Sequence, residues 1–351
     1  MRIRTICFTK KGMETSLDIR KALAEYSVNE QHEGIGAIED IRSYAKYENA
    51  GIDVSGGLSD ITVYDGSVQQ WAHEGMRSGA ALIFIGAMGI AVRAVAGSIQ
   101  DKLTDSPVLV VDELATYVIP VLSGHVGGAN KLAHIIAEAL GAHPVITTAT
   151  DIEGAFSPDL FAVENNLSIM NKDGIAKVSS KALSGKPIRI SIENYPPSGE
   201  DICDVVVGAN ENYIHSGVLN LCPKQYAVGI GCRKGTDSGA LSDFVRSVLE
   251  ENCIDARLVG AIASIDVKSG EQALIDLSYS MRVPFITFTK EQLLMARGEY
   301  EESEFVMQQV GVGNVCERAA MVLTGNAGTI VVKKRKYDGM TIAVAKINSR
   351  A

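Results

Sequence analysis

The sequence predicts a multi-domain α/β protein, built mainly of parallel sheets that are flanked by helices. Two observations carry this prediction. Short apolar runs rich in β-branched residues alternate with helical patterns along the chain, and 351 residues exceed what one core usually holds. The alternation breaks near Asp151 and restarts at Tyr226. We therefore expect an N-terminal α/β domain with glycine-rich turns over residues 1–150, a middle α/β domain over 151–223 and a C-terminal α/β domain over 224–351.

The N-terminal domain is expected to begin with a strand at RIRTICFT, followed by a helix over Met13–Tyr26. Residues Ser27–Ser59 are polar and rich in glycine, which predicts a loop or lid. Further strands are expected at ALIFIG, PVLVVD and YVIPVL, then a helix over Gly127–Leu140 and a strand at PVITT.

The middle domain shows helical stretches over Pro158–Asn165 and Lys172–Leu183, the strand IRISIEN, the turn YPPSGED and the apolar runs DVVVGAN and VLNLCP. In the C-terminal domain we expect strands at YAVGIGC, LVGAIASI and PFITF and helices over Asp237–Asn252 and Val315–Leu323. The runs TIVVKKRKY and MTIAVAKI predict a closing hairpin, because Asp-Gly between two strands favours a tight turn.

Composition argues against several classes of partner. The net charge of −9 and the aromatic content of 6% disfavour nucleic acid and anionic membranes, which need a basic footprint or stacking surfaces. The acidic excess lies before Lys224, where the chain has 17 basic and 27 acidic residues. From Lys224 onward it has 16 basic and 15 acidic residues, so the C-terminal part can bind an anionic ligand more easily. No apolar run approaches the roughly 20 residues that span a bilayer. The six cysteines include no Cys-x-x-Cys pair, so we expect them to be reduced thiols of a cytoplasmic protein. For the same reason we expect no metal site in the protein.

Three glycine-rich turns lie between an expected strand and an expected helix, where free backbone N–H groups can receive an anion. The first is IFIGAMGIAVR, in which Gly86 and Gly89 permit close backbone approach and Arg93 lies one turn into the helix. Glycines that only let the helix pack on the strand would give the same pattern.

The second turn is LSGHVGGANKL, where three glycines surround His125 and precede Asn130. A histidine exchanges protons near neutral pH, so one held in a turn at a strand end is suited to general acid or base catalysis. A structural or solvent-facing histidine is the alternative. The backbone at Gly127 and Gly128 is expected to help bind an anionic group.

The third turn is AVGIGCRKGTDSG, whose glycine spacing is one residue too long for a dinucleotide-binding fingerprint. The turn after Gly231 carries Arg233 and Lys234, with Thr236 as the expected N-cap, a set that suits carboxylates or phosphates. A solvated basic turn is the alternative, and Cys232 is expected to be a packed thiol.

Acidic residues also stand where strands are expected to end, as ligand-binding residues of α/β proteins often do. These are Asp112 and Glu113, Asp151, and the group formed by Asp266, Lys268 and Glu271. Each also fits a helix cap or a surface ion pair, the interpretation we prefer for Glu271. The common nucleotide, zinc-protease, nucleophile-elbow and calcium-loop motifs are absent from the sequence.

Taken in order, long segments of the chain resemble the CbiG family of cobalamin-biosynthesis proteins, the cobalt-precorrin-5A hydrolases. The N-terminal segments are GAMGIAVRAVAGSIQDKLTDSPVLVVDE and LSGHVGGANKLAHIIAEALGAHPVITTATD. The C-terminal segments are VGIGCRKGT, IASIDVKSGE, VGVGNVCERAA and TIAVAKI. Residues before about Ile61 and the block from Asp151 to Pro223 resemble the family only loosely.

The resemblance implies a hydrolase of anaerobic vitamin B12 biosynthesis that opens the δ-lactone on ring A of a cobalt-precorrin macrocycle and releases acetaldehyde. It implies no separate cofactor, because the cobalt arrives inside the substrate. Axial ligation of that cobalt by His125 or Cys232 stays open. Other enzymes of the B12 pathway and a second copy of the chain, as a homodimer, also remain open as partners.

Our hypothesis for the site is that His125 is the general acid or base, with Glu113 or Asp112 as its acidic partner. Arg93, Arg233 and Lys234 would bind the carboxylates of the macrocycle. We expect the N-terminal glycine turns to face the C-terminal turn across a cleft between domains. Two other functions stay open: a tetrapyrrole carrier or chaperone that turns nothing over, and an unrelated α/β enzyme for a small phosphorylated or carboxylated metabolite.

Overall fold

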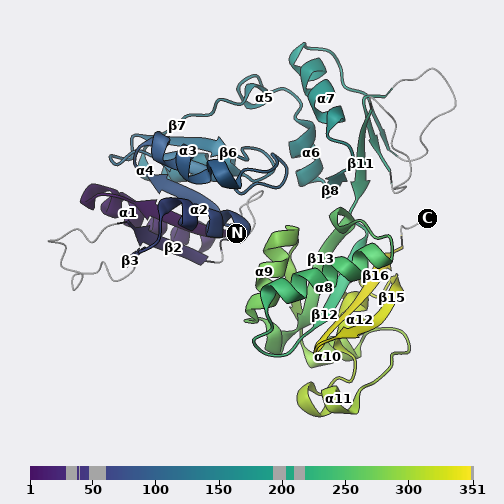
Figure 1. Cartoon of the computed structure of the whole chain (residues 1–351). Helices are drawn as coiled ribbons and strands as arrows, with labels where there is room; N and C mark the ends of the chain where they lie inside the picture. The colour runs from purple at the N-terminus through teal and green to yellow at the C-terminus, as the bar shows by residue number, and fades with distance from the viewer. Residues whose placement is uncertain (29–37, 39, 47–60, 193–202, 209–217, 349–351) are drawn as a thin grey trace. The chain divides into compact units, whose positions relative to one another are not determined.

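The computed structural model describes residues 1–28, 38, 40–46, 61–192, 203–208 and 218–348. The chain divides into two compact units. The N-terminal unit contains Met1–Glu164 and Ile175–Ile188, and the C-terminal unit contains Asn165–Gly174 and Arg189–Ala351. The described strands form three sheets in which most neighbours are parallel, and helices flank these sheets (Figure 1), so the expected α/β class is confirmed.

The N-terminal unit is built on a seven-stranded sheet with the order β3-β2-β1-β4-β5-β6-β7. Its strands are β1 (Arg2–Cys7), β2 (Asp40–Ala45), β3 (Ile61–Val63), β4 (Ala81–Ile85), β5 (Val108–Val111), β6 (Tyr117–Leu122) and β7 (His143–Pro144). All neighbouring strands are parallel except β5 and β6. Strand β4 is apolar and buried throughout, as expected for a central strand with helices on both faces.

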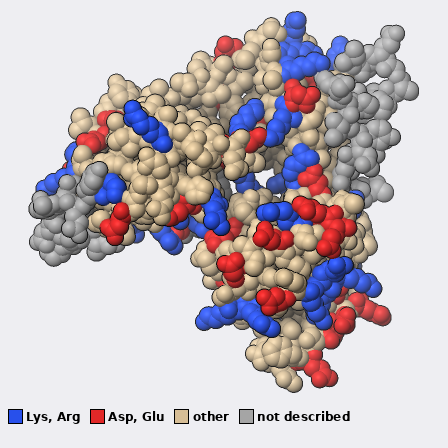
Figure 2. Space-filling view, in the orientation of Figure 1, with Lys and Arg blue, Asp and Glu red and all other residues tan. Residues whose placement is uncertain are grey.

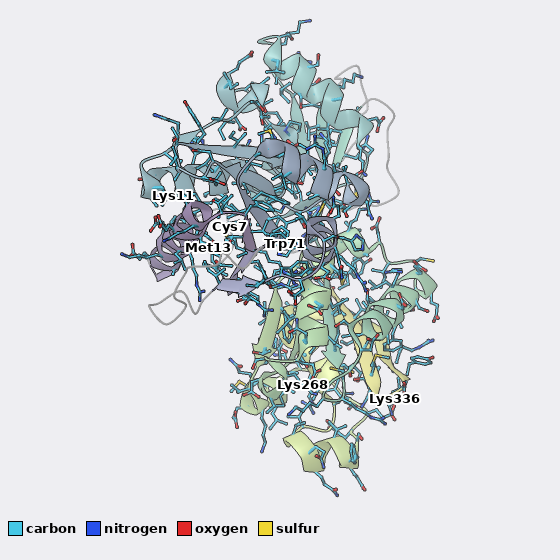
Figure 3. All side chains as sticks on the ribbon, turned by 60° about the vertical axis from the view of Figure 1, so that its left-hand side comes forward. Cys7, Lys11, Met13, Trp71, Lys268 and Lys336 are labelled. Carbon is cyan, nitrogen blue, oxygen red and sulfur yellow. The ribbon has the colours of Figure 1, made fainter. Side chains whose placement is uncertain are left out.

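Helices α1 (Lys10–Val28) and α4 (Ala129–Leu140) cover one face of this sheet, and α2 (Val68–Arg77) and α3 (Met88–Val95) cover the other. The helices α5 (Ala149–Ile152), α6 (Pro158–Glu164) and α7 (Asp173–Leu183) follow along the chain. Helices α1 and α4 pack in one core with Cys7 and Met13, and helices α2 and α3 pack in the other around Trp71 (Figure 3). Alternate residues of β4 serve the two cores, Ile83 the first and Phe84 the second.

The antiparallel strand β6 decides where the loops of this unit lie. Strands β1, β4 and β5 all end at one edge of the sheet, which we call the carboxyl edge. Because β6 runs the other way, with Leu122 opposite Val108, the loop that follows β6 lies at the other edge, the amino edge. There the Ser123 hydroxyl donates a 2.6 Å hydrogen bond to the carbonyl of Asp105.

The C-terminal unit holds two sheets. A four-stranded sheet has the order β8-β11-β10-β9, with β8 (Leu167–Ile169), β9 (Ile190–Ile192), β10 (Val205–Val207) and β11 (Leu219–Pro223). A five-stranded sheet has the order β14-β13-β12-β16-β15, with β12 (Tyr226–Gly231), β13 (Val259–Ile265), β14 (Phe285–Phe288), β15 (Gly328–Tyr337) and β16 (Met340–Ile347). Strands β12, β13 and β14 are parallel, and β16 is antiparallel to β12.

Helices α8 (Ser238–Glu251) and α9 (Gln272–Met281) supply one core of the five-stranded sheet, and α12 (Val315–Leu323) packs with α10 (Lys290–Leu294) on the other. Helix α11 (Glu304–Val310) precedes α12. A close approach of α12 to β12 requires glycine: a Cβ on Gly229 would lie 1.8 Å from the carbonyl oxygen of Cys316. None of the described helices is long and apolar enough to cross a membrane.

Most expected elements occur at or near their predicted positions. Helix α12 has the predicted bounds, and the closing hairpin turns at Asp338 and Gly339, both with positive φ. Two expectations were wrong. The segment Ser27–Ser59, expected to be a loop or lid, contains the strand β2. Apart from β2 and residues 38 and 46, the segment from residue 29 onward lies outside the described ranges. The expected strand PVITT reduces to the end of β7.

Candidate functional site

His125 is held in a tight glycine turn between β6 and α4. Residue Ser123 has φ +55° and Gly128 has φ +83°, so the chain reverses within a few residues. A Cβ on Gly127 would lie 2.9 Å from the Ser123 carbonyl oxygen, which leaves room only for glycine. The His125 carbonyl accepts a 3.0 Å hydrogen bond from the Gly128 N–H. The turn therefore fixes the backbone from which His125 projects.

The imidazole of His125 lies between two carboxylates. Its Nδ1 is 3.2 Å from Asp159 Oδ1, and its Nε2 is 3.0 Å from Asp151 Oδ2. The side chains differ in exposure: 11% for His125 and 12% for Asp159, but 30% for Asp151. One side of the ring is thus buried and the other is accessible to solvent.

Polar neighbours complete the cluster. The Ser157 hydroxyl donates a 2.6 Å hydrogen bond to Asp159 Oδ1 and lies 3.1 Å from Nδ1 of the ring. On the Nε2 side, the Asn130 amide donates to Asp151 Oδ2 and to the hydroxyl of Thr148. We call His125, Asn130, Asp151, Ser157 and Asp159 the histidine cluster. All five belong to the N-terminal unit.

The electrostatics of the cluster favour the charged imidazole. The hydrogen bond to Asp159 raises the pKa of His125, against the opposing effect of burial, and the charge of Asp151 adds to the rise. Burial alone would raise the pKa of Asp159, but hydrogen bonds from His125 and Ser157 and the charges of His125 and Lys102 hold it below its usual range. The cluster is therefore a cation held between anions, which can release a proton when a stronger base forms beside it.

The acidic partners of His125 differ from those we expected. Asp112 and Glu113 follow β5 at the carboxyl edge, whereas the turn of His125 lies at the amino edge. The Asp112 carboxylate accepts hydrogen bonds from the backbone N–H groups of Leu114 and Tyr117, so it caps its own turn. The proposed pairing of His125 with either residue is therefore wrong, because the reversal of β6 separates them.

The turn of Gly86 and Gly89 also lies at the carboxyl edge. Gly86, with φ +147°, donates a 2.9 Å backbone hydrogen bond to Val111, and Arg93 donates to the Gly89 carbonyl at 3.0 Å. Within this unit the first two glycine turns therefore lie at opposite edges of one sheet. Our expectation that both turns line one site is therefore wrong.

The basic turn of the C-terminal unit lies at the end of β12. Arg233 and Lys234 are exposed, and the N-cap of α8 is Asp237, which accepts from the Ala240 N–H at 2.8 Å, instead of the expected Thr236. The Thr236 hydroxyl instead donates to the Arg233 carbonyl. Gly339 lies in the turn between β15 and β16, and a Cβ at this position would lie 2.5 Å from Arg233 Nε. Arg233 therefore lies against the hairpin turn.

Glu271 connects this basic turn to the loop after β13. Its carboxylate, 7% exposed, accepts a 2.8 Å hydrogen bond from the Gly235 N–H and forms a 3.1 Å ion pair with Lys268. Asp266 is exposed and accepts from the N–H of Val267. Because β12 and β13 are parallel, the residues expected to bind ligand after each strand do lie at one edge.

A second group of cations lies on the edge strand β15, where Figure 2 shows basic side chains gathered. Arg335 is 2.9 Å from Glu251 and Lys336 is 4.0 Å from Glu301, so both have acidic neighbours. Charged side chains on an edge strand also prevent pairing with another sheet. We therefore give β15 no part in the site.

The cysteines and the acidic groups offer little to a metal. None of the six cysteines, all of which lie in the described ranges, forms a disulfide, and burial raises the pKa of Cys232 despite the nearby charge of Lys268. Across the described ranges there is no group of three or more histidine, cysteine or acidic side chains arranged to hold a metal ion.

Comparison with known proteins adds an independent finding. A family model for the N-terminal part of cobalamin synthesis protein G matches residues 70–151, and a model for its C-terminus matches residues 226–345. The chain is 33% identical over 304 residues to the cobalt-precorrin-5A hydrolase of Salmonella typhimurium, covering 80% of this chain and 86% of that protein. The chain belongs to the CbiG family. It is therefore a hydrolase of cobalamin biosynthesis.

The chain is also similar to two further proteins. The cobalt-precorrin-5A hydrolase of Priestia megaterium is 31% identical over 317 residues, covering 82% of this chain and 84% of that protein. A solved structure of a putative cobalamin biosynthesis protein G homolog from Sulfolobus solfataricus is 20% identical, with a TM-score of 0.39 and coverage of 99% and 97% of the two chains.

The matched regions divide the candidate residues. The N-terminal CbiG match includes the Gly86 turn, His125 and Asn130 and ends at Asp151, so Ser157 and Asp159 lie beyond it. The C-terminal match includes the basic turn and the loop of Asp266 and Lys268.

Sequence reasoning missed Ser157 and Asp159. In the run SPDLF, serine and aspartate around proline fit an ordinary helix start, and nothing local connects them to a histidine that lies 32 residues before the serine and 34 before the aspartate.

Proposed function

We propose that this chain hydrolyses cobalt-precorrin-5A, opening the δ-lactone on ring A and releasing acetaldehyde to give cobalt-precorrin-5B. The names of relatives at 33% and 31% identity support the substrate. The observation that carries the chemistry is the imidazole of His125, held between two carboxylates within a segment that matches the family. The cobalt belongs to the substrate, and the proposal invokes no separate cofactor.

The reaction has two steps. In the first, water adds to the acyl carbon, the bond from that carbon to the ring oxygen breaks, and a carboxylic acid and an alcohol result. In the second, the alcohol loses its proton, its oxygen forms a carbonyl, and the neighbouring carbon–carbon bond breaks. The electron pair of that bond passes to the macrocycle, which takes up a proton, and acetaldehyde leaves. The first step needs an acid for the departing oxygen, and the second needs a base for the hydroxyl.

A charged His125 meets both needs in turn. As an acid it protonates the departing oxygen, and the neutral imidazole that remains accepts the hydroxyl proton in the second step. Arg233 and Lys234, exposed at the end of β12, are suited to the peripheral carboxylates of the macrocycle. Arg93, at the carboxyl edge of the other unit, is a separate candidate for the same role.

The test is release of acetaldehyde from cobalt-precorrin-5A by the purified chain and by its His125→Ala variant. We expect turnover by the wild type and a loss on the order of 100-fold or more in the variant. Binding of the macrocycle without acetaldehyde would instead assign the chain as a carrier. A folded variant with full activity would remove His125 from the mechanism.

A further inference from the structure

The two nitrogens of the His125 ring have different surroundings. Nδ1 faces the buried pair of Ser157 and Asp159, whereas Nε2 faces Asp151, whose side chain is 30% exposed, with the hydroxyl of Thr150 at 3.4 Å. A substrate that approaches from solvent therefore meets the Nε2 side of the ring first.

Asp159 is fixed by its own contacts. Its Oδ1 accepts from the Ser157 hydroxyl at 2.6 Å and from the Leu160 N–H at 3.2 Å, and its Oδ2 lies 3.8 Å from Lys102 Nζ. A carboxylate held this way at the start of α6 is poorly placed to reach a substrate. It is well placed to hold the ring of His125 in one orientation, as a buried carboxylate does in hydrolases with a nucleophile, a histidine and an acid.

We propose that Asp159 is the positioning residue that keeps a proton on Nδ1 of His125, so that proton exchange with the substrate takes place at Nε2. This inference rests on the proposed function. Ser157 assists by holding Asp159 Oδ1 toward the ring, and Asp151 is the exposed carboxylate that orients the Nε2 proton until the substrate arrives.

The proton movements balance. During lactone opening the Nε2–H bond breaks, the proton passes to the departing oxygen, and its electron pair stays on Nε2, while the proton that the attacking water loses passes to solvent. The neutral ring then carries its remaining proton on Nδ1, donated to Asp159. In the second step the hydroxyl proton passes to Nε2, which restores the charged ring, while the electrons of the broken carbon–carbon bond go to the macrocycle, and water supplies the proton that it takes up.

The charged groups around the ring agree with this division. Asp151 and Asp159 face the two nitrogens, and Lys102 lies beyond Asp159. The pKa of Asp159 is lowered, so this residue stays ionised and accepts the Nδ1 proton throughout the cycle. Loss of that acceptor would free the neutral ring to carry its proton on either nitrogen.

The experiment compares Asp159→Asn with Glu164→Gln, a matched change on the exposed side of the same helix. We expect Asp159→Asn to lower kcat on the order of 100-fold with little change in KM and to shift the basic limb of the pH profile of kcat to lower pH, because the charged ring then loses its proton more easily, while Glu164→Gln changes neither. Asp159→Glu should restore part of kcat. A kcat and pH profile equal to the wild type in a folded Asp159→Asn variant would overturn the proposal.

Nitrogen NMR of ring-labelled histidine, with the His125 signal assigned by its loss in His125→Ala, gives a readout independent of turnover. We expect the neutral ring of the wild type to carry its proton on Nδ1 and that of Asp159→Asn to carry it partly on Nε2. The same tautomer in both would refute the positioning role. The expected tautomer shift in a chain that releases no acetaldehyde would refute the proposed function and leave the positioning intact.

Discussion

Replacing His125 by alanine should lower the stability of the N-terminal unit by an amount that depends on pH. The change leaves Asp159 with 12% exposure and without the ring that faces it. Removing one member of a buried ion pair costs about 3–5 kcal/mol. We take the lower end, about 3 kcal/mol, because Lys102 lies 3.8 Å from Asp159 and Asp151 keeps contact with solvent.

The sign of the pH effect follows from the direction of the pKa shift. The pKa of His125 is raised in the folded chain, so its stabilisation is fully present below the unfolded value of 6.5 and is lost as the pH rises through the folded value. The difference between wild type and variant should therefore shrink above neutral pH toward about 1 kcal/mol, the value of a neutral hydrogen bond. Asp159 acts oppositely: its pKa is lowered, so its contribution is lost only at strongly acidic pH.

Urea unfolding followed by Trp71 fluorescence measures this difference. Trp71 is the only tryptophan of the chain and is fully buried in the N-terminal unit, so its signal reports that unit alone. His134→Ala, on the exposed face of α4, is the matched control and should change stability little at any pH. A His125→Ala difference that stays constant from about pH 6 to about pH 9 would show that the ring is not a stabilising cation.

Two further predictions concern the C-terminal unit. Arg233→Ala should raise KM and leave kcat nearly unchanged in the acetaldehyde assay, because a contact with a substrate carboxylate that is equally strong in the ground and transition states affects substrate binding alone. Arg246→Ala, which removes an exposed cation on α8, serves as the control. An unaltered KM in Arg233→Ala would argue against contact between Arg233 and the substrate. Gly229→Ala should destabilise this unit by about 3 kcal/mol or more in urea unfolding followed by circular dichroism, because its Cβ would overlap the Cys316 carbonyl. Gly260→Ala on the adjacent strand, whose Cβ would meet nothing nearer than 3.6 Å, should cost far less, and equal losses would contradict the packing argument.

The elements that the sequence predicted well are those determined by local chemistry. Helix α12 has Asn314 as its N-cap, and the closing hairpin has Asp338 and Gly339 in the turn, so both could be located within a few residues. The N-cap of α8 was misplaced by one residue because Thr236 and Asp237 are both good capping residues, and only the contact with the Ala240 N–H distinguishes them.

The candidate site was harder to predict because strand direction is not encoded in an apolar run. The sequence YVIPVL indicates a strand, but its antiparallel pairing with β5 is a tertiary property. Because of that pairing, His125 lies at the amino edge of the sheet, whereas Asp112 and Glu113 lie at the carboxyl edge. His125 itself could be found from its glycine turn, whereas Asp159 acquires its role only when α6 folds back onto that turn.

The topology of the N-terminal unit therefore separates two kinds of surface. Strand β4 has five residues, which at about 3.3 Å per residue places roughly 15 Å between the edges of the sheet. The amino edge holds the histidine cluster, for which we propose proton exchange, whereas the carboxyl edge holds the Gly86 turn with exposed Met88 and Val92. A ring nitrogen must come within about 3 Å of the atom it protonates, so chemistry at Nε2 of His125 requires the lactone at the amino edge. The Gly86 turn and Arg93 then contact the same macrocycle only if it extends across the whole sheet, and the backbone amides that stabilise the oxyanion have to come from elements near the amino edge.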